Sequence, residues 1–111
     1  MEVMSGTTRT RLTRRERRLL AEVETSPFAW ELRALVRERR RYEAPATWLL
    51  IKLTERAQPA NKNSPLWPKT PNQVGKMLNK FMPSLRIKGV AVSYHRHGKY
   101  GRLWLIRQQN R

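Results

Sequence analysis

Amide and amine side chains are concentrated in one stretch of the chain, residues 70–88, which reads TPNQVGKMLNKFMPSLRIK. On a helix its polar side chains would lie on one side and include no acid; they are Asn72, Gln73, Lys76, Asn79 and Lys80. Asparagine and glutamine amides can pair with the edge of adenine, and lysine can bind guanine or phosphate. The stretch therefore predicts a helix face that binds nucleic acid. An ordinary solvated helix face is the alternative that it leaves open.

The same stretch contains the signals that would form and position this helix. Thr70 is a candidate N-cap, Pro71 occupies the first helical position, and Gln73 stands where a capping box has glutamate or glutamine. The apolar residues recur at helical spacing on the other side; they are Val74, Met77, Leu78, Phe81 and Leu85. We expect the helix to bury this apolar stripe and to present its polar face to a partner, with Lys69 and Thr70 where the contact begins.

A β-hairpin is predicted after Gly89. Val90, Val92 and Tyr94 alternate with small residues, and residues 102–107 form a second run rich in β-forming types. The segment between these runs holds two glycines and strongly polar side chains, as expected for a long hairpin tip. We expect this tip to contact the backbone of a nucleic acid through His95, Arg96, Lys99, Tyr100 and Arg102.

Two histidines in the hairpin invite a test for catalysis. His95 and His97 would lie on one side of a strand, with Tyr94 and Tyr100 nearby. A metal held by two histidines beside a tyrosine nucleophile could cleave a phosphodiester, but such sites also use clustered carboxylates. The chain has no aspartate, and its last acid is Glu55. We therefore expect no enzyme activity, no metal and no other cofactor; protonated histidines would instead strengthen contacts with phosphate as the pH falls.

Net charge is the strongest compositional signal. The 111 residues include 24 lysines and arginines against eight acids, a formal charge of +16. Self-repulsion of this size disfavours a compact fold unless a polyanion is the working partner. The predicted partner is double-stranded DNA, bound by a monomer or a homodimer; single-stranded DNA, RNA and a replication protein are the alternatives. With no cysteine, no secretory signal and no long apolar run, the sequence predicts a cytoplasmic, nucleoid-associated protein without a membrane partner.

Residues 1–25 are predicted to form a basic arm and an extension helix ahead of the main domain, residues 26–111. Thr13 and Glu16 make a capping box in front of a short apolar edge, so we expect a weakly docked helix. The arginines of this region either add phosphate contacts or only solubilise the extension. Those predicted to contact DNA are Arg9, Arg11, Arg14 and Arg15.

Two further helices are predicted before the polar stretch. The first begins at the Ser26-Pro27 pair and ends near Arg40, and the second begins at Pro45, with a short extended link at residues 42–43. In the second helix, Trp48 and Ile51 fall off the apolar stripe and could pack against the preceding helix, which would bury it on more than one side.

Residues 58–68 are predicted to be a loop, because they contain three prolines, two asparagines and a serine. We expect Trp67, which stands between two of these prolines, to cover the core as a plug, and Trp104 to lie in the core.

Taken together, residues 26–108 resemble the C-terminal domain found on many phage and plasmid replication proteins of the primase–helicase type. The motifs that carry the resemblance are Tyr42, Leu49-Leu50, Trp67–Pro71, Pro83–Arg86, Gly89 and Arg102–Ile106. The resemblance implies a winged helix that is appended to an ATPase or primase core. The glycine loop and acidic cluster of such a core are missing here, and Ala44-Pro45 replaces the family's usual Gly-Thr pair. What the resemblance implies for this chain is therefore a binding domain without an activity.

The predicted fold is mostly α with a C-terminal β-hairpin, that is, a winged helix-turn-helix with an N-terminal basic helical extension. The predicted function is non-catalytic binding of duplex DNA in the replication or regulation of a phage or plasmid. A module that recruits a replication partner, or a single-strand binder in which Tyr100 stacks on bases, is the alternative.

Overall fold

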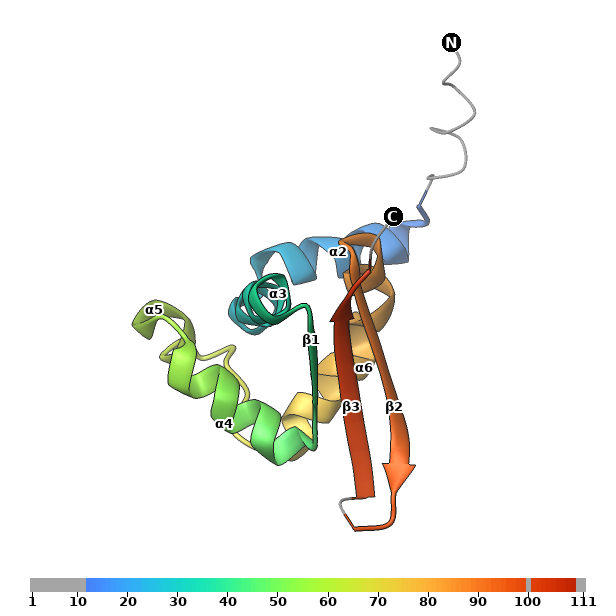
Figure 1. Ribbon diagram of the computed structural model, residues 1–111. Coiled ribbons are helices and arrows are strands. Elements are labelled where there is room, and N and C mark those ends of the chain that lie inside the picture. The colour runs from blue at the N-terminus through green and yellow to red at the C-terminus, as the bar shows by residue number, and fades with distance from the viewer. Residues whose placement is uncertain (1–11, 100, 110–111) are drawn as a thin grey trace.

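The computed structural model describes residues 12–99 and 101–109, so the predictions for Arg9, Arg11 and Tyr100 lie outside the described residues. The chain is mostly helical, with a small antiparallel sheet of three strands towards its C-terminal end (Figure 1). The elements in order are α2 (Arg14–Thr25), α3 (Pro27–Arg39), β1 (Arg41–Ala44), α4 (Ala46–Arg56), α5 (Pro59–Lys62), α6 (Pro71–Ile87), β2 (Val90–His97) and β3 (Gly101–Gln108). Within the described residues, no helix is long and apolar enough to cross a membrane.

The predicted hairpin is present as β2 and β3, but it belongs to a sheet with the strand order β1-β3-β2. The extended conformation predicted for residues 42–43 is confirmed, but the segment is more than a link, because it forms β1 and pairs with the edge of β3 that β2 leaves free. Tyr42 lies opposite Ile106, and Ala44 lies opposite Trp104. The third strand covers an edge that would otherwise expose unpaired backbone groups.

The sheet buries one face against the helices. Because side chains alternate along a strand, Val92 and its cross-strand partner Ile106 face the core, and so does Trp104. The opposite, outer face carries Glu43 and His95. The end of the hairpin extends beyond the helices, at the bottom of Figure 1.

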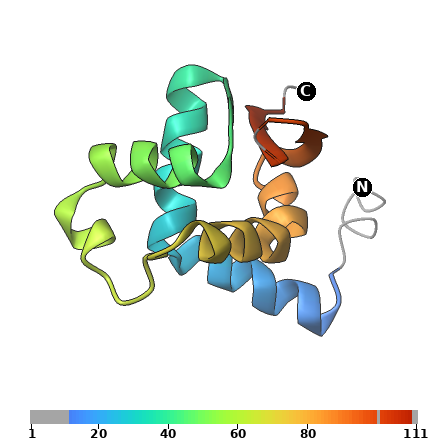
Figure 2. The ribbon, with the colours of Figure 1, turned by 90° about the horizontal axis from the view of Figure 1, so that it is seen from below.

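The predicted α2 helix is present and packs against α6. Val23 is 1% exposed and belongs to the core, and α2 lies alongside α6, which separates it from α4 (Figure 2). Two ion pairs join α2 to the second half of α6 and its C-cap: Lys80 with Glu22 at 2.9 Å, and Lys88 with Glu24 at 2.6 Å. These ion pairs, which the sequence analysis did not predict, add to the contact that Val23 makes with the core.

The helix beginnings follow the predicted capping. Thr13 and Glu16 form the complete capping box at the start of α2. The Thr70 hydroxyl accepts a hydrogen bond from the Gln73 amide at 3.2 Å, which caps α6. The Gln73 side chain accepts from the backbone N–H of Lys69, one residue earlier than a capping box requires. The start of α6, where the polar face begins, is therefore held by two side chains.

The segment 58–68 is not entirely loop, because it contains the short helix α5. A buried acid, Glu31 of α3, holds this segment by accepting hydrogen bonds from the Gln58 backbone N–H at 3.0 Å and the Asn61 side chain at 2.7 Å. Trp67 is buried as predicted; its indole N–H donates to the Thr54 hydroxyl at 3.2 Å. Trp104 is 1% exposed, which confirms its place in the core.

The expectation that Trp48 and Ile51 pack against the preceding helix was wrong. Their side chains are 61% and 47% exposed, whereas Leu49 and Leu53 are fully buried. Ile51 lies about 200° around the helix axis from Leu49. Because the neighbouring helices cover α4 on the Leu49 side, the other side is left in solvent.

Candidate nucleic-acid interface

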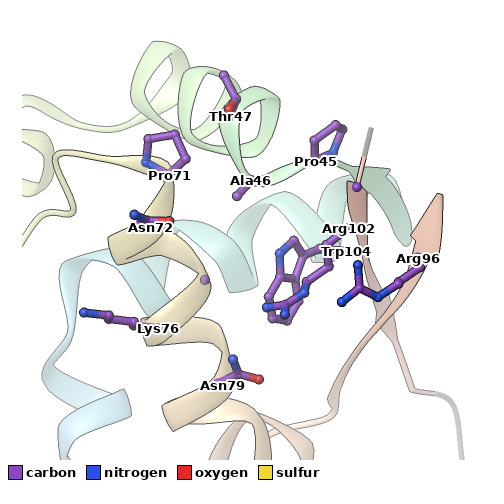
Figure 3. A pocket seen from close by; sticks show the side chains of 12 residues that line it. Pro45, Ala46, Thr47, Pro71, Asn72, Lys76, Asn79, Arg96, Arg102 and Trp104 are labelled. Atoms are coloured by element: carbon purple, nitrogen blue, oxygen red, sulfur yellow. The ribbon is translucent and has the colours of Figure 1, made fainter. Parts of the chain in front are cut away.

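A groove of about 490 Å³ lies between the first half of α6, the β2–β3 hairpin and the beginning of α4 (Figure 3). Its lining combines amide, amine and guanidinium groups with bare backbone and one buried indole. The lining residues are Pro45, Ala46, Thr47, Pro71, Asn72, Gly75, Lys76, Asn79, Arg96, Gly101, Arg102 and Trp104.

The α6 wall of the groove consists of Asn72, Lys76 and Asn79. These residues follow one another at i, i+4 and i+7, so they share one side of the helix, and all three are exposed. Figure 3 shows Asn79 on the side of α6 that faces the hairpin and Asn72 at the first turn of the helix, while the Lys76 side chain extends away from the hairpin. The helix can take this position because Val74 and Leu78, on its other side, are fully buried.

The hairpin wall consists of Arg96 and Arg102, which are cross-strand partners on the sheet face that also carries Trp104. The Arg102 guanidinium lies over the ring of Tyr94, with its central carbon 4.4 Å from the ring centroid. That ring in turn packs on Trp104, at 4.9 Å between centroids. Stacking of this kind holds the guanidinium plane in place while its N–H groups can still donate.

Three cations, Lys76, Arg96 and Arg102, make the groove electropositive. In the part of the chain that the structure describes, no carboxylate lies within ion-pair distance of Lys76, Arg96 or Arg102. The two walls therefore carry amide, amine and guanidinium groups around one groove, and these groups can donate hydrogen bonds to an anion.

Four of the residues predicted to contact nucleic acid at or near α6 lie outside this groove. Lys80 is directed to α2 by its ion pair with Glu22. Lys69 and Gln73 are exposed but bonded to each other through the capping interaction at the start of α6. Thr70 likewise acts as the N-cap.

The hairpin residues are divided between the two faces of the sheet. His95 lies on the outer face, where its Nε2 is 3.0 Å from Glu43 Oε2, and Arg41 approaches the same carboxylate at 3.8 Å. The turn carries Lys99, whose backbone N–H donates to His97 Nδ1 at 3.2 Å. The structure thus brings Arg96 and Arg102 together with α6 but places His95 on the other side of the sheet.

The predicted arm contacts are represented by Arg14 and Arg15, in the exposed first turn of α2. They do not line the groove. Among the described residues no group of three or more acids and histidines is arranged to hold a metal ion.

The sequence analysis did not predict two parts of the groove lining: a rim formed by residues 45–47, and a floor between the two walls that includes Gly75. The rim is the beginning of α4, residues 45–47, which the fold brings next to Pro71. The floor includes Gly75, a glycine inside a helical pattern, and that anomaly was the signal that could have identified it.

The chain thus presents a small, mostly helical domain in which a groove joins a helix face to a basic hairpin. Residues 28–111 match the family described as AICE RepA C-terminal domain. The chain belongs to this family, and it is a replication-protein C-terminal domain, as its resemblance had implied. Neither a curated protein nor a solved structure matches the chain.

Proposed function

We propose that this protein is a winged helix that binds duplex DNA without catalysing a reaction, and that it acts in the replication or regulation of a phage-like or plasmid-like element. The order of its elements from α3 onwards, apart from the short α5, is helix, strand, helix, helix, strand, strand, which supports the winged-helix assignment. The α6 helix would enter the major groove, and the hairpin would follow the backbone.

The observation that carries the proposal is the shared groove. The groove is lined by residues of both elements: Asn72, Lys76 and Asn79 from α6, and Arg96 and Arg102 from the hairpin. The sequence predicted the helix face and the hairpin tip independently of each other. Asparagine amides can read adenine, and arginines can hold phosphate. The family match supports the role in replication.

The proposal is tested by the salt dependence of binding to a labelled mixed-sequence duplex, measured by fluorescence anisotropy. Each phosphate contact contributes about 0.9 to the slope of log affinity against log salt concentration. The double variant Arg96→Ala/Arg102→Ala should lower this slope by about 1.8. The matched control, Arg41→Ala/Arg107→Ala, removes the same charge from the outer face of the sheet and should leave the slope unchanged. Equal losses in both double variants would refute the proposed surface.

A partner-recruiting role is the second candidate, because Trp48 and Ile51 expose apolar surface on α4 outside the groove. Under this alternative, a partner would bind at high salt and the DNA affinity would be weak and lost at modest salt. A selection from random duplexes at two salt concentrations distinguishes the two candidate functions. Only a domain that recognises DNA sequence enriches the same sequences at both salt concentrations.

A further inference from the structure

Gly75 stands in the interior of α6, where glycine destabilises a helix relative to alanine. The backbone does not require glycine at this position. The glycines with positive φ in the described chain are Gly89 and Gly101, whereas Gly75 has ordinary helical geometry.

Packing does not require glycine at this position either. A Cβ built on Gly75 would lie 3.7 Å from Trp104 Cζ2, an ordinary van der Waals contact. Apart from the two adjacent residues and the helix's own backbone, no second atom would lie within 4 Å. An alanine would therefore fit the free protein and favour its helix.

Gly75 lies in the lining of the groove, where the absence of a side chain affects what can bind. It lies in the floor of the groove, three residues after Asn72 and four before Asn79, opposite Arg102 and Trp104. The missing side chain leaves a strip of bare backbone between these polar groups, and a ligand can approach a glycine backbone more closely than any other. Positive charge flanks the strip on both sides, since Lys76 extends away from the two hairpin arginines (Figure 3).

We propose that Gly75 is a seat for one strand of the sugar–phosphate backbone of duplex DNA. A deoxyribose would rest on the Gly75 backbone and the edge of Trp104, with its phosphates directed to Arg96 and Arg102 on one side and to Lys76 on the other. This inference rests on the proposed DNA-binding function and adds a steric determinant to it.

The aromatic residues of the groove favour a sugar over an unpaired base. Base stacking needs an open ring face, but Trp104, the aromatic residue among the described residues that line the groove, is 1% exposed. The neighbouring ring of Tyr94 is covered by the Arg102 guanidinium. The groove therefore offers an edge and bare backbone, which suit a sugar.

The test measures stability and DNA affinity in the same variants. Gly75→Ala should raise the melting temperature by about 2–5 °C and weaken binding of a mixed-sequence duplex by at least about threefold. Its salt slope should stay unchanged, because the loss is steric. Gly75→Leu should weaken binding further. The matched control is Pro83→Ala, which also favours α6 but lies outside the groove; it should raise the melting temperature and leave the affinity unchanged.

Each other result has a defined meaning. If Gly75→Ala binds duplex as tightly as the parent while Arg96→Ala/Arg102→Ala loses affinity, the seat is refuted and the proposed function stands. If the parent protein shows no salt-dependent duplex binding, both are refuted. A lower melting temperature for Gly75→Ala would show that the glycine serves packing. A larger loss for the unpaired strand than for the duplex would assign the seat to a base.

Discussion

Lys76 and Lys80 stand one turn apart on α6, and the structure predicts opposite consequences of replacing them with alanine. Lys76 lines the groove and is exposed. Lys80 forms an ion pair with Glu22 of α2 at 2.9 Å. The sequence alone gave these lysines the same role, so they form a matched pair that differs only in its surroundings.

The magnitude follows from counterion release. One phosphate contact contributes about 0.9 to the salt slope, so over a fourfold rise in salt concentration it changes the affinity about 3.5-fold. We expect Lys76→Ala to lose one such contact. Lys80→Ala should keep the full slope and should instead lower the free energy of unfolding by about 0.2–1 kcal/mol, the usual contribution of an exposed ion pair.

The assay is fluorescence anisotropy with a mixed-sequence duplex across a salt series, together with urea unfolding of each variant. The reasoning would be refuted if Lys80→Ala lowered the salt slope as much as Lys76→Ala, because Lys80 would then contact DNA despite its partner on α2.

Three other predictions concern individual side chains and ion pairs. Glu31→Ala should lower the free energy of unfolding by about 1–3 kcal/mol, since it removes two hydrogen bonds to a buried carboxylate; urea unfolding measures this. Asn72→Ala should leave the salt slope unchanged but reduce discrimination between a selected site and mixed sequence in competition assays. The hydrogen bonds and charges of Lys88 and Arg56 lower the pKa of Glu24 and Glu38 below 4.5. The stability that these pairs contribute is therefore complete above pH 4.5 and lost as the pH falls through the lower folded-state values, which melting curves across acid pH would detect.

Local signals in the sequence predicted most of the helices and the hairpin. The capping residues Thr13, Ser26 and Thr70 were recognised because capping depends on neighbours along the chain. The pairing of β1 with β3 was not predicted, since it joins residues far apart in sequence. The exposure of Trp48 was missed for the same reason: it depends on which side of α4 the other helices cover.

The candidate site was predictable as two separate lists of residues but not as one groove. Side-chain type and spacing identified Asn72, Lys76 and Arg96, but they could not show that Lys80 is engaged by Glu22. Nor could they show that His95 lies across the sheet from Arg96, bonded to Glu43. These outcomes depend on tertiary packing and on the register of the strands.

The most direct test of the central claim is a titration of isotope-labelled protein with a short duplex, followed by the NMR signals of backbone amides and arginine side chains. We expect the largest shifts at residues 71–79 and at Arg96 and Arg102, with little change at Glu43, His95 or the exposed side of α4. Shifts concentrated on the outer face of the sheet or around Trp48, with the groove unchanged, would contradict the account.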